Sequence, residues 1–235
     1  MKNMDRLIIL FLMVLAMPGA NVVLAQEAPK DAAIVVAVSG AVTYQNQSKQ
    51  LSPAAMQAFM KMYQHDVLTL PAESQIKLLY PKGGRKETWK GPVVFRLGEK
   101  ESTVEGQDAS QPQVENLPKI ARSVRETNLP LIERGGVAIV RASESQKSDQ
   151  AAPTPIPLEL SDEELAEIEE AKAAYAEMKT QSEAADVTPE LYLLSVLAYY
   201  DQYQEMQPLI AELLKIHPEN EVLRQWEEWV KAQQH

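Results

Sequence analysis

The sequence contains no cysteine. Disulfide bonds, thiolate catalysis and cysteine-ligated metals are therefore excluded for this chain, as is the lipid-modified cysteine that tethers a bacterial lipoprotein. Stability must come from the burial of apolar side chains. The 235 residues are enough for one or two small domains with such a core.

Basic charge and histidine are also scarce. The chain carries 23 Lys and Arg against 33 Asp and Glu, a formal charge of −10 at pH 7. A surface of this sign repels phosphate, which argues against nucleic acid and anionic lipid headgroups as partners. His65, His217 and His235 are isolated, and none has a second histidine at metal-ligand spacing. We therefore predict no metal site and no cofactor.

Only one long apolar run is present, and it lies near the N-terminus. Residues 7–17 contain no polar side chain, follow a short basic head and end at Pro18. The run is about half the length of a membrane span and is followed by small residues up to Ala25, a pattern typical of a secretory signal peptide. We predict cleavage after Ala25 and an exported, periplasmic mature protein. An uncleaved anchor over residues 1–25 is the alternative.

Short apolar runs separated by turn residues fill the next part of the chain. They lie at residues 34–38, 42–45, 67–70, 76–80, 87–90 and 93–97. Runs of this length at roughly ten-residue spacing, bounded by glycine and proline, are typical of antiparallel strands. We therefore predict a small β-sandwich or barrel. One segment differs, because the apolar residues of 53–63 recur at helical spacing and predict a short helical turn.

The predicted β-domain covers residues 26–142. It includes a helix and a strand that follow the apolar runs, because each of these two elements is too small to be stable alone. Asn116 precedes an amphipathic stretch with Pro118 in its first turn, which predicts a capped helix. A glycine pair then opens a predicted strand over residues 137–141. Residues 143–160 are polar, contain alternating prolines and form a predicted linker to a second domain.

The remaining residues, 161–235, have helical periodicity throughout. Ser161 and Glu164 match a capping box at the start of the first helix. Thr188 and Pro189 start a second helix, whose nearly continuous apolar sequence predicts the most buried position. Two amphipathic helices follow. The predicted fold class is therefore α+β, with an N-terminal β-domain followed by a domain of α-helical hairpins.

Five segments of the β-region match the pattern of a known family. They are residues 38–42 (VSGAV), 65–71 (HDVLTLP), 76–80 (IKLLY), 83–84 (GG) and 91–95 (GPVVF). This pattern resembles a FecR-type domain, a periplasmic β-module of bacterial envelope proteins. The resemblance implies a ligand-binding module or one that relays a signal to a membrane-spanning regulator. The family usually has Gly-Asp where this chain has His65-Asp66, which implies a different local backbone or a degenerate turn there.

The helical region carries the pattern of a second family. Leu193, Leu197, Tyr203, Ile210 and Pro218 fall at its helix-packing and closing positions. The region resembles one degenerate tetratricopeptide repeat with an unmatched helix on either side. Leu194 and Met206 replace the small residues expected in the family, so the resemblance implies wider helix packing. It also implies a protein-binding surface.

No group of polar residues forms a catalytic motif, and we predict that the chain is not an enzyme. His65 and Asp66 are neighbours in an expected strand and would point to opposite faces, which argues against a base and its orienter. An acidic run fits the solvated start of a helix better than a calcium loop; it comprises Asp162, Glu163, Glu164, Glu167, Glu169 and Glu170. A basic cluster fits either a solvated helix face or a contact with an anionic partner; it comprises Lys119, Arg122, Arg125, Arg134 and Arg141.

Aromatic residues are concentrated in the helical region, and aromatic side chains are common interface anchors. The spacing of Trp226 and Trp229 fits core packing and an interface equally well. Tyr199, Tyr200 and Tyr203 lie at the end of one helix and the start of the next, and we predict that they bind a partner. The predicted function is a non-enzymatic envelope protein that acts as a protein-interaction scaffold through its helical repeat. A periplasmic ligand-binding or signal-relay module of the FecR type is the alternative, with an envelope polymer or small ligand at the β-domain.

Overall fold

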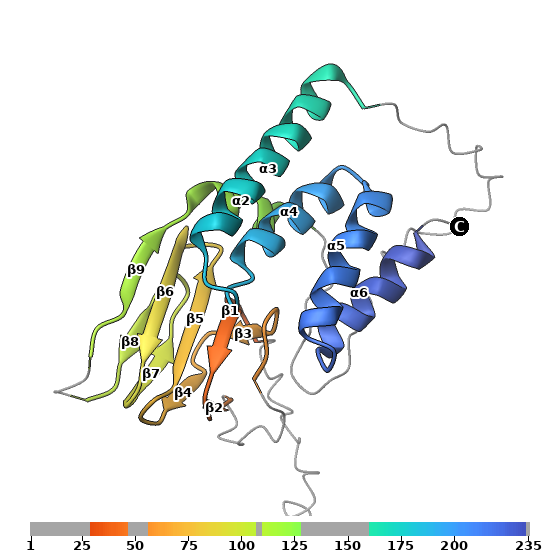
Figure 1. The fold of residues 1–235 in the computed structure, drawn as a ribbon. Helices are drawn as coiled ribbons and strands as arrows, with labels where there is room; N and C mark the ends of the chain where they lie inside the picture. Colours follow the sequence, from red (N-terminus) through yellow and green to blue (C-terminus); the bar gives the residue numbers. More distant parts are fainter. Residues whose placement is uncertain (1–28, 47–55, 107–109, 128–159, 234–235) are drawn as a thin grey trace, which may run out of the picture.

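The computed structural model describes residues 29–46, 56–106, 110–127 and 160–233. These residues form an α+β fold in which two antiparallel sheets lie beside a group of helices (Figure 1). The predicted signal peptide, the strand over residues 137–141 and the linker up to residue 159 lie outside the described residues. No helix within the described ranges is long and apolar enough to cross a membrane.

All six predicted apolar runs overlap strands. The five-stranded sheet has the order β3-β1-β5-β6-β9, formed by β1 (Asp31–Ser39), β3 (Lys61–Tyr63), β5 (Gln75–Tyr80), β6 (Arg85–Lys90) and β9 (Gln113–Asn116). The four-stranded sheet has the order β2-β4-β7-β8, formed by β2 (Thr43–Gln45), β4 (Val67–Leu70), β7 (Val93–Leu97) and β8 (Ser102–Val104).

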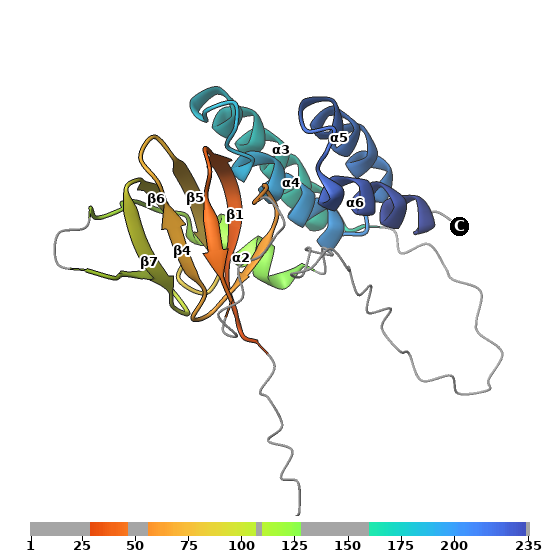
Figure 2. The same ribbon diagram turned by 90° about the horizontal axis from the view of Figure 1, so that it is seen from below.

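The two sheets pack face to face, and the described strands do not close into a barrel. Between the sheets, Trp89 of β6 stacks on Phe95 of β7 with ring centroids 4.2 Å apart. Alternate residues of β5 face opposite ways: Leu78 enters this inter-sheet core, whereas Leu79 enters a second core shared with the helices. The five-stranded sheet is therefore the middle layer, between the other sheet and the helices (Figure 2).

Two local predictions were wrong. The segment 53–63 is not a helical turn where it is described: Lys61–Tyr63 is β3 and pairs with β1, with a register shift between Asp31 and Ala33. Asn116 does not cap the following helix. It is the last residue of β9, where it pairs with Arg85, and the helix starts after Leu117 without a side-chain cap.

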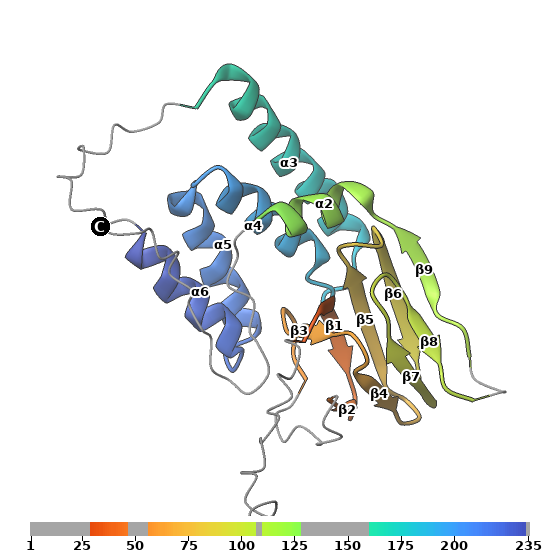
Figure 3. The same cartoon turned by 180° about the vertical axis from the view of Figure 1, so that it is seen from behind.

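The described helices are α2 (Pro118–Glu126), α3 (Asp162–Gln181), α4 (Thr188–Tyr199), α5 (Tyr203–Ile216) and α6 (Glu221–Ala232). The capping box of Ser161 and Glu164 is present at the start of α3. Residues 188–197 of α4 are all buried, as the apolar sequence predicted. The helix α2 follows the sheet yet lies against α4, so that the two regions of the chain interlock (Figure 3).

The helices are attached to the middle sheet through a continuous apolar core. Val36 of β1 belongs to this core together with residues of α4 and α6, and Phe59 contacts Trp226 with ring centroids 4.8 Å apart. Two hydrogen bonds cross the same boundary. The Val187 amide donates to the Val36 carbonyl (2.9 Å), and Asn220 Nδ2 donates to the Ala58 carbonyl (3.1 Å).

The turn at His65 has a left-handed backbone. His65 has φ 69°, a conformation that glycine adopts without strain, and its amide donates to the Leu97 carbonyl (2.7 Å). The neighbouring Asp66 is fully buried and accepts a hydrogen bond from the Tyr63 amide (3.0 Å). His65 is exposed while Asp66 is buried, so the two side chains do not form a base and its orienter.

Candidate functional site

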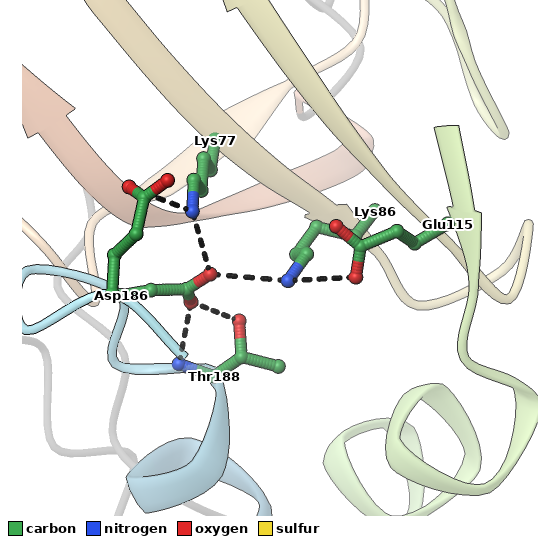
Figure 4. A network of polar contacts seen from close by, with 6 residues as sticks. Lys77, Lys86, Glu115, Asp186 and Thr188 are labelled. Carbon is green, nitrogen blue, oxygen red and sulfur yellow. Dashed lines mark hydrogen bonds and ion pairs between the residues drawn. The ribbon is translucent and has the colours of Figure 1, made fainter. Parts of the chain in front are cut away.

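A buried ionic network lies between the sheet and the helices (Figure 4). Asp186, in the loop between α3 and α4, is 2% exposed, and its Oδ2 lies 3.1 Å from Lys77 Nζ and 3.0 Å from Lys86 Nζ. Its Oδ1 accepts hydrogen bonds from the amide (3.0 Å) and the hydroxyl (2.5 Å) of Thr188. The carboxylate therefore joins β5 and β6 to the start of α4.

Each lysine has a second, more exposed partner. Lys77 Nζ lies 3.1 Å from Glu183, and Lys86 Nζ lies 3.0 Å from Glu115 of β9. A cavity of about 280 Å³ borders the network. The charged side chains at this cavity, Lys77, Lys86 and their acidic partners, are already paired with one another.

The electrostatics of the network favour its ionised form. Burial acts to raise the pKa of Asp186, but the Thr188 hydrogen bonds and the Lys86 charge outweigh it, so the pKa lies below its ordinary value. Burial acts to lower the pKa of Lys77, but the bonds and charges of Asp186 and Glu183 outweigh it and raise the pKa. A protonated lysine is not a nucleophile. The network is therefore suited to fixing the helices on the sheet rather than to covalent catalysis.

A larger cavity, of about 360 Å³, lies between α2, α3 and α4. Its volume falls within the range typical of ligand sites. Its lining combines charged side chains of both signs with three phenol rings: Lys119, Arg122, Ser123, Glu126, Glu167, Glu170, Tyr192, Val196, Tyr199 and Tyr200.

The structure places two of the three predicted tyrosines at this cavity. Tyr199 is 56% exposed and makes an edge contact with Tyr200, with ring centroids 5.0 Å apart. The Tyr200 hydroxyl donates to Glu167 of α3 (2.5 Å), and this bond raises the pKa of Tyr200 to about 12. Tyr203 lies outside the cavity lining; it packs edge-on against Trp229, with ring centroids 5.3 Å apart, and donates to Asp201.

Two members of the predicted basic cluster also line the cavity. Lys119 Nζ lies 2.9 Å from Glu170, and Arg122 Nε lies 3.2 Å from Glu126. Arg125 instead donates to the Pro81 carbonyl (3.3 Å). Arg134 and Arg141 fall outside the described residues.

Sequence reasoning missed Glu167 and Tyr192 as parts of this site. Glu167 belongs to the acidic run that was assigned to solvent, and only the packing of α3 against α4 brings it to the Tyr200 hydroxyl. Tyr192 is 9% exposed and lies among the apolar residues of α4. Its position one turn before Val196 and two turns before Tyr199 was the available signal, because these spacings place all three on one helix face.

The described residues contain no group of three or more His, Asp or Glu side chains that could hold a metal ion. Comparisons with protein families, with curated proteins and with solved structures find no match to this chain.

Proposed function

We propose that this chain is a non-enzymatic, exported envelope protein that binds a protein partner at the cavity between α2, α3 and α4. The observation that carries the proposal is the exposure of Tyr199. A tyrosine that is 56% exposed at the rim of a hollow gives a partner a large, rigid contact surface with few rotamers to immobilise. The buried ionic network supports the proposal because it holds α4, and with it the site, on a rigid sheet.

We further propose that the β-region is a FecR-type domain and that the helices are a degenerate tetratricopeptide repeat. Support for the first comes from the positive φ of Gly40 and Gly84 (76° and 64°) and of His65 (69°), which stands where the family has glycine. Support for the second comes from the contact of α4 with α5, the two helices that carry the repeat pattern, and from the contacts of these helices with their flanking neighbours α3 and α6.

A second candidate function is a ligand-binding or signal-relay module of the FecR type. It is favoured by a cavity of about 200 Å³ beside β1, whose lining includes Lys61, Lys82 and Arg125. Basic side chains around an apolar floor suit a small anionic ligand or an acidic envelope polymer. The candidate is secondary because Lys61 and Lys82 already pair with Asp31 and Glu99.

The test is site-specific photo-crosslinking in cells, with the photoreactive residue at Tyr199. Ile216, at the end of α5, is the matched control, because it is 59% exposed and lies outside the cavity lining. We expect a discrete crosslinked envelope protein from position 199 and none from position 216. The same products from both positions, or none from position 199, would refute the proposed site.

The variant Tyr199→Ala separates binding from folding. Truncation of an exposed anchor should weaken partner capture by about 1–2 kcal/mol or more and leave thermal unfolding nearly unchanged. Tyr203→Ala is the comparison, because Tyr203 packs on Trp229 and its loss should lower stability instead. Sequencing the mature N-terminus tests export, since a chain that starts at Gln26 is expected.

A further inference from the structure

The charged side chains that line the cavity between α2, α3 and α4 differ in whether they have an ion-pair partner. Glu170 is paired with Lys119, and Glu126 is paired with Arg122. Glu167 is different, because among the described residues it has no ion pair and accepts one side-chain hydrogen bond, from the neutral hydroxyl of Tyr200. A carboxylate has about four lone-pair sites, so Glu167 has acceptor capacity left for a donor from outside the chain.

The surroundings of Glu167 favour a cation over an anion. The Tyr199 ring lies beside the Tyr200 ring, and ring faces attract cations through their quadrupole. Glu167 itself is exposed on α3, a helix with many more acidic than basic residues. The basic residues of α3, Lys172 and Lys179, are paired with other glutamates and not with Glu167.

We infer that the protein partner inserts an arginine side chain into this cavity, where the guanidinium pairs with Glu167 and stacks on Tyr199. This inference rests on the proposed function. Arginine fits better than lysine because its planar fork can bond the carboxylate and lie on an aromatic ring at the same time. The net charge of −10 also favours the approach of a basic partner segment to the protein. An acidic partner that pairs with Lys119 and Arg122 is the competing outcome.

The test uses defined probes on the full chain. Acetyl-arginine amide, its neutral isostere acetyl-citrulline amide and acetyl-glutamate amide are titrated while NMR follows the labelled tyrosine rings, a method that detects millimolar binding. We expect saturable shifts at Tyr199 and Tyr200 with the arginine probe alone. Glu167→Gln should weaken that binding roughly three- to five-fold, as expected for loss of an exposed ion pair.

Glu169→Gln is the matched control, because Glu169 is on the same helix, pairs with Lys172 and does not line the cavity. It removes one negative charge, as Glu167→Gln does, and should leave the affinity unchanged. Equal binding of the citrulline probe, tighter binding of the glutamate probe, or no localised shift with arginine would overturn the inference.

The inference and the proposed function can fail separately. A crosslinked envelope protein at position 199 with no arginine binding would refute the cation site and retain the protein-binding role. Localised arginine binding with no crosslinked protein would refute the protein-binding role and retain the cation site.

Discussion

Asp186→Asn is the sharpest test of how the helices are held on the sheet. The substitution keeps the side-chain volume and an oxygen for the Thr188 amide, but it removes the charge that Lys77 and Lys86 share. Both lysines are 6% exposed, and removing one partner of a buried ion pair typically costs about 3–5 kcal/mol. Glu183 and Glu115 still pair with the lysines, so we expect a loss of about 2–4 kcal/mol in the free energy of unfolding.

Urea unfolding measured by both circular dichroism and tryptophan fluorescence gives this free energy. Glu183→Gln and Glu115→Gln are the controls, because these side chains are 69% and 43% exposed and each should cost no more than about 1 kcal/mol. Hydrogen exchange of the Val187 amide, which bonds to Val36, should accelerate in the Asp186 variant. An Asp186 variant as stable as the two controls would refute the conclusion that the buried carboxylate fixes the helices to the sheet.

Four further predictions address other parts of the molecule. The pKa of Asp186 is lower in the folded than in the unfolded chain, so its contribution to stability is present above about pH 4 and is lost as the pH falls through the folded pKa. The free energy of unfolding should therefore fall more steeply with decreasing pH in the wild type than in the Asn variant. Glu167→Gln should lower the pKa of Tyr200 from about 12 towards its ordinary value of about 10, measured by titration of tyrosine absorbance with Tyr200→Phe as reference; an unchanged titration contradicts the bond. His65→Gly should leave stability unchanged or raise it by up to about 1 kcal/mol in urea unfolding, whereas a clear loss would argue against the left-handed backbone. A protease site inserted into residues 143–157 and then cut should leave two fragments that co-elute in gel filtration, because sheet and helices share a core; separate elution would show independent domains.

The strands could be predicted from the sequence because their ends carry strong local signals. Ser39-Gly40 ends β1 and the Pro81–Gly84 turn separates β5 from β6, so turn chemistry alone located both boundaries. The strand β3 gave no such signal. It is three residues long, and the spacing of its buried residues depends on an irregular register with β1 that only the folded sheet defines.

The ionic network and the binding cavity were harder to predict than the fold, because the residues of each come from distant segments. Asp186 is 109 residues from Lys77 in the sequence, and no local pattern links them. Lys77 lies between Ile76 and Leu78, an alternation typical of a strand with one solvent-facing side, so the sequence did not indicate that the lysine is buried. The three tyrosines looked equivalent in sequence, and only the packing of α5 on α6 separates Tyr203 from the other two.

Lys77 also limits how β5 can pair with its neighbours. Leu78 and Tyr80 face the inter-sheet core, and a slip of one residue would turn Lys77 into that core. The acidic group there, Glu87, already bonds Arg85, Trp89 and the Ser102 amide, so a lysine arriving beside it would have to displace an existing partner. A buried lysine thus penalises the wrong alignment of the strand by several kcal/mol, of the order of an uncompensated charge. The sheet gains a single defined register from a residue that an apolar side chain could have replaced.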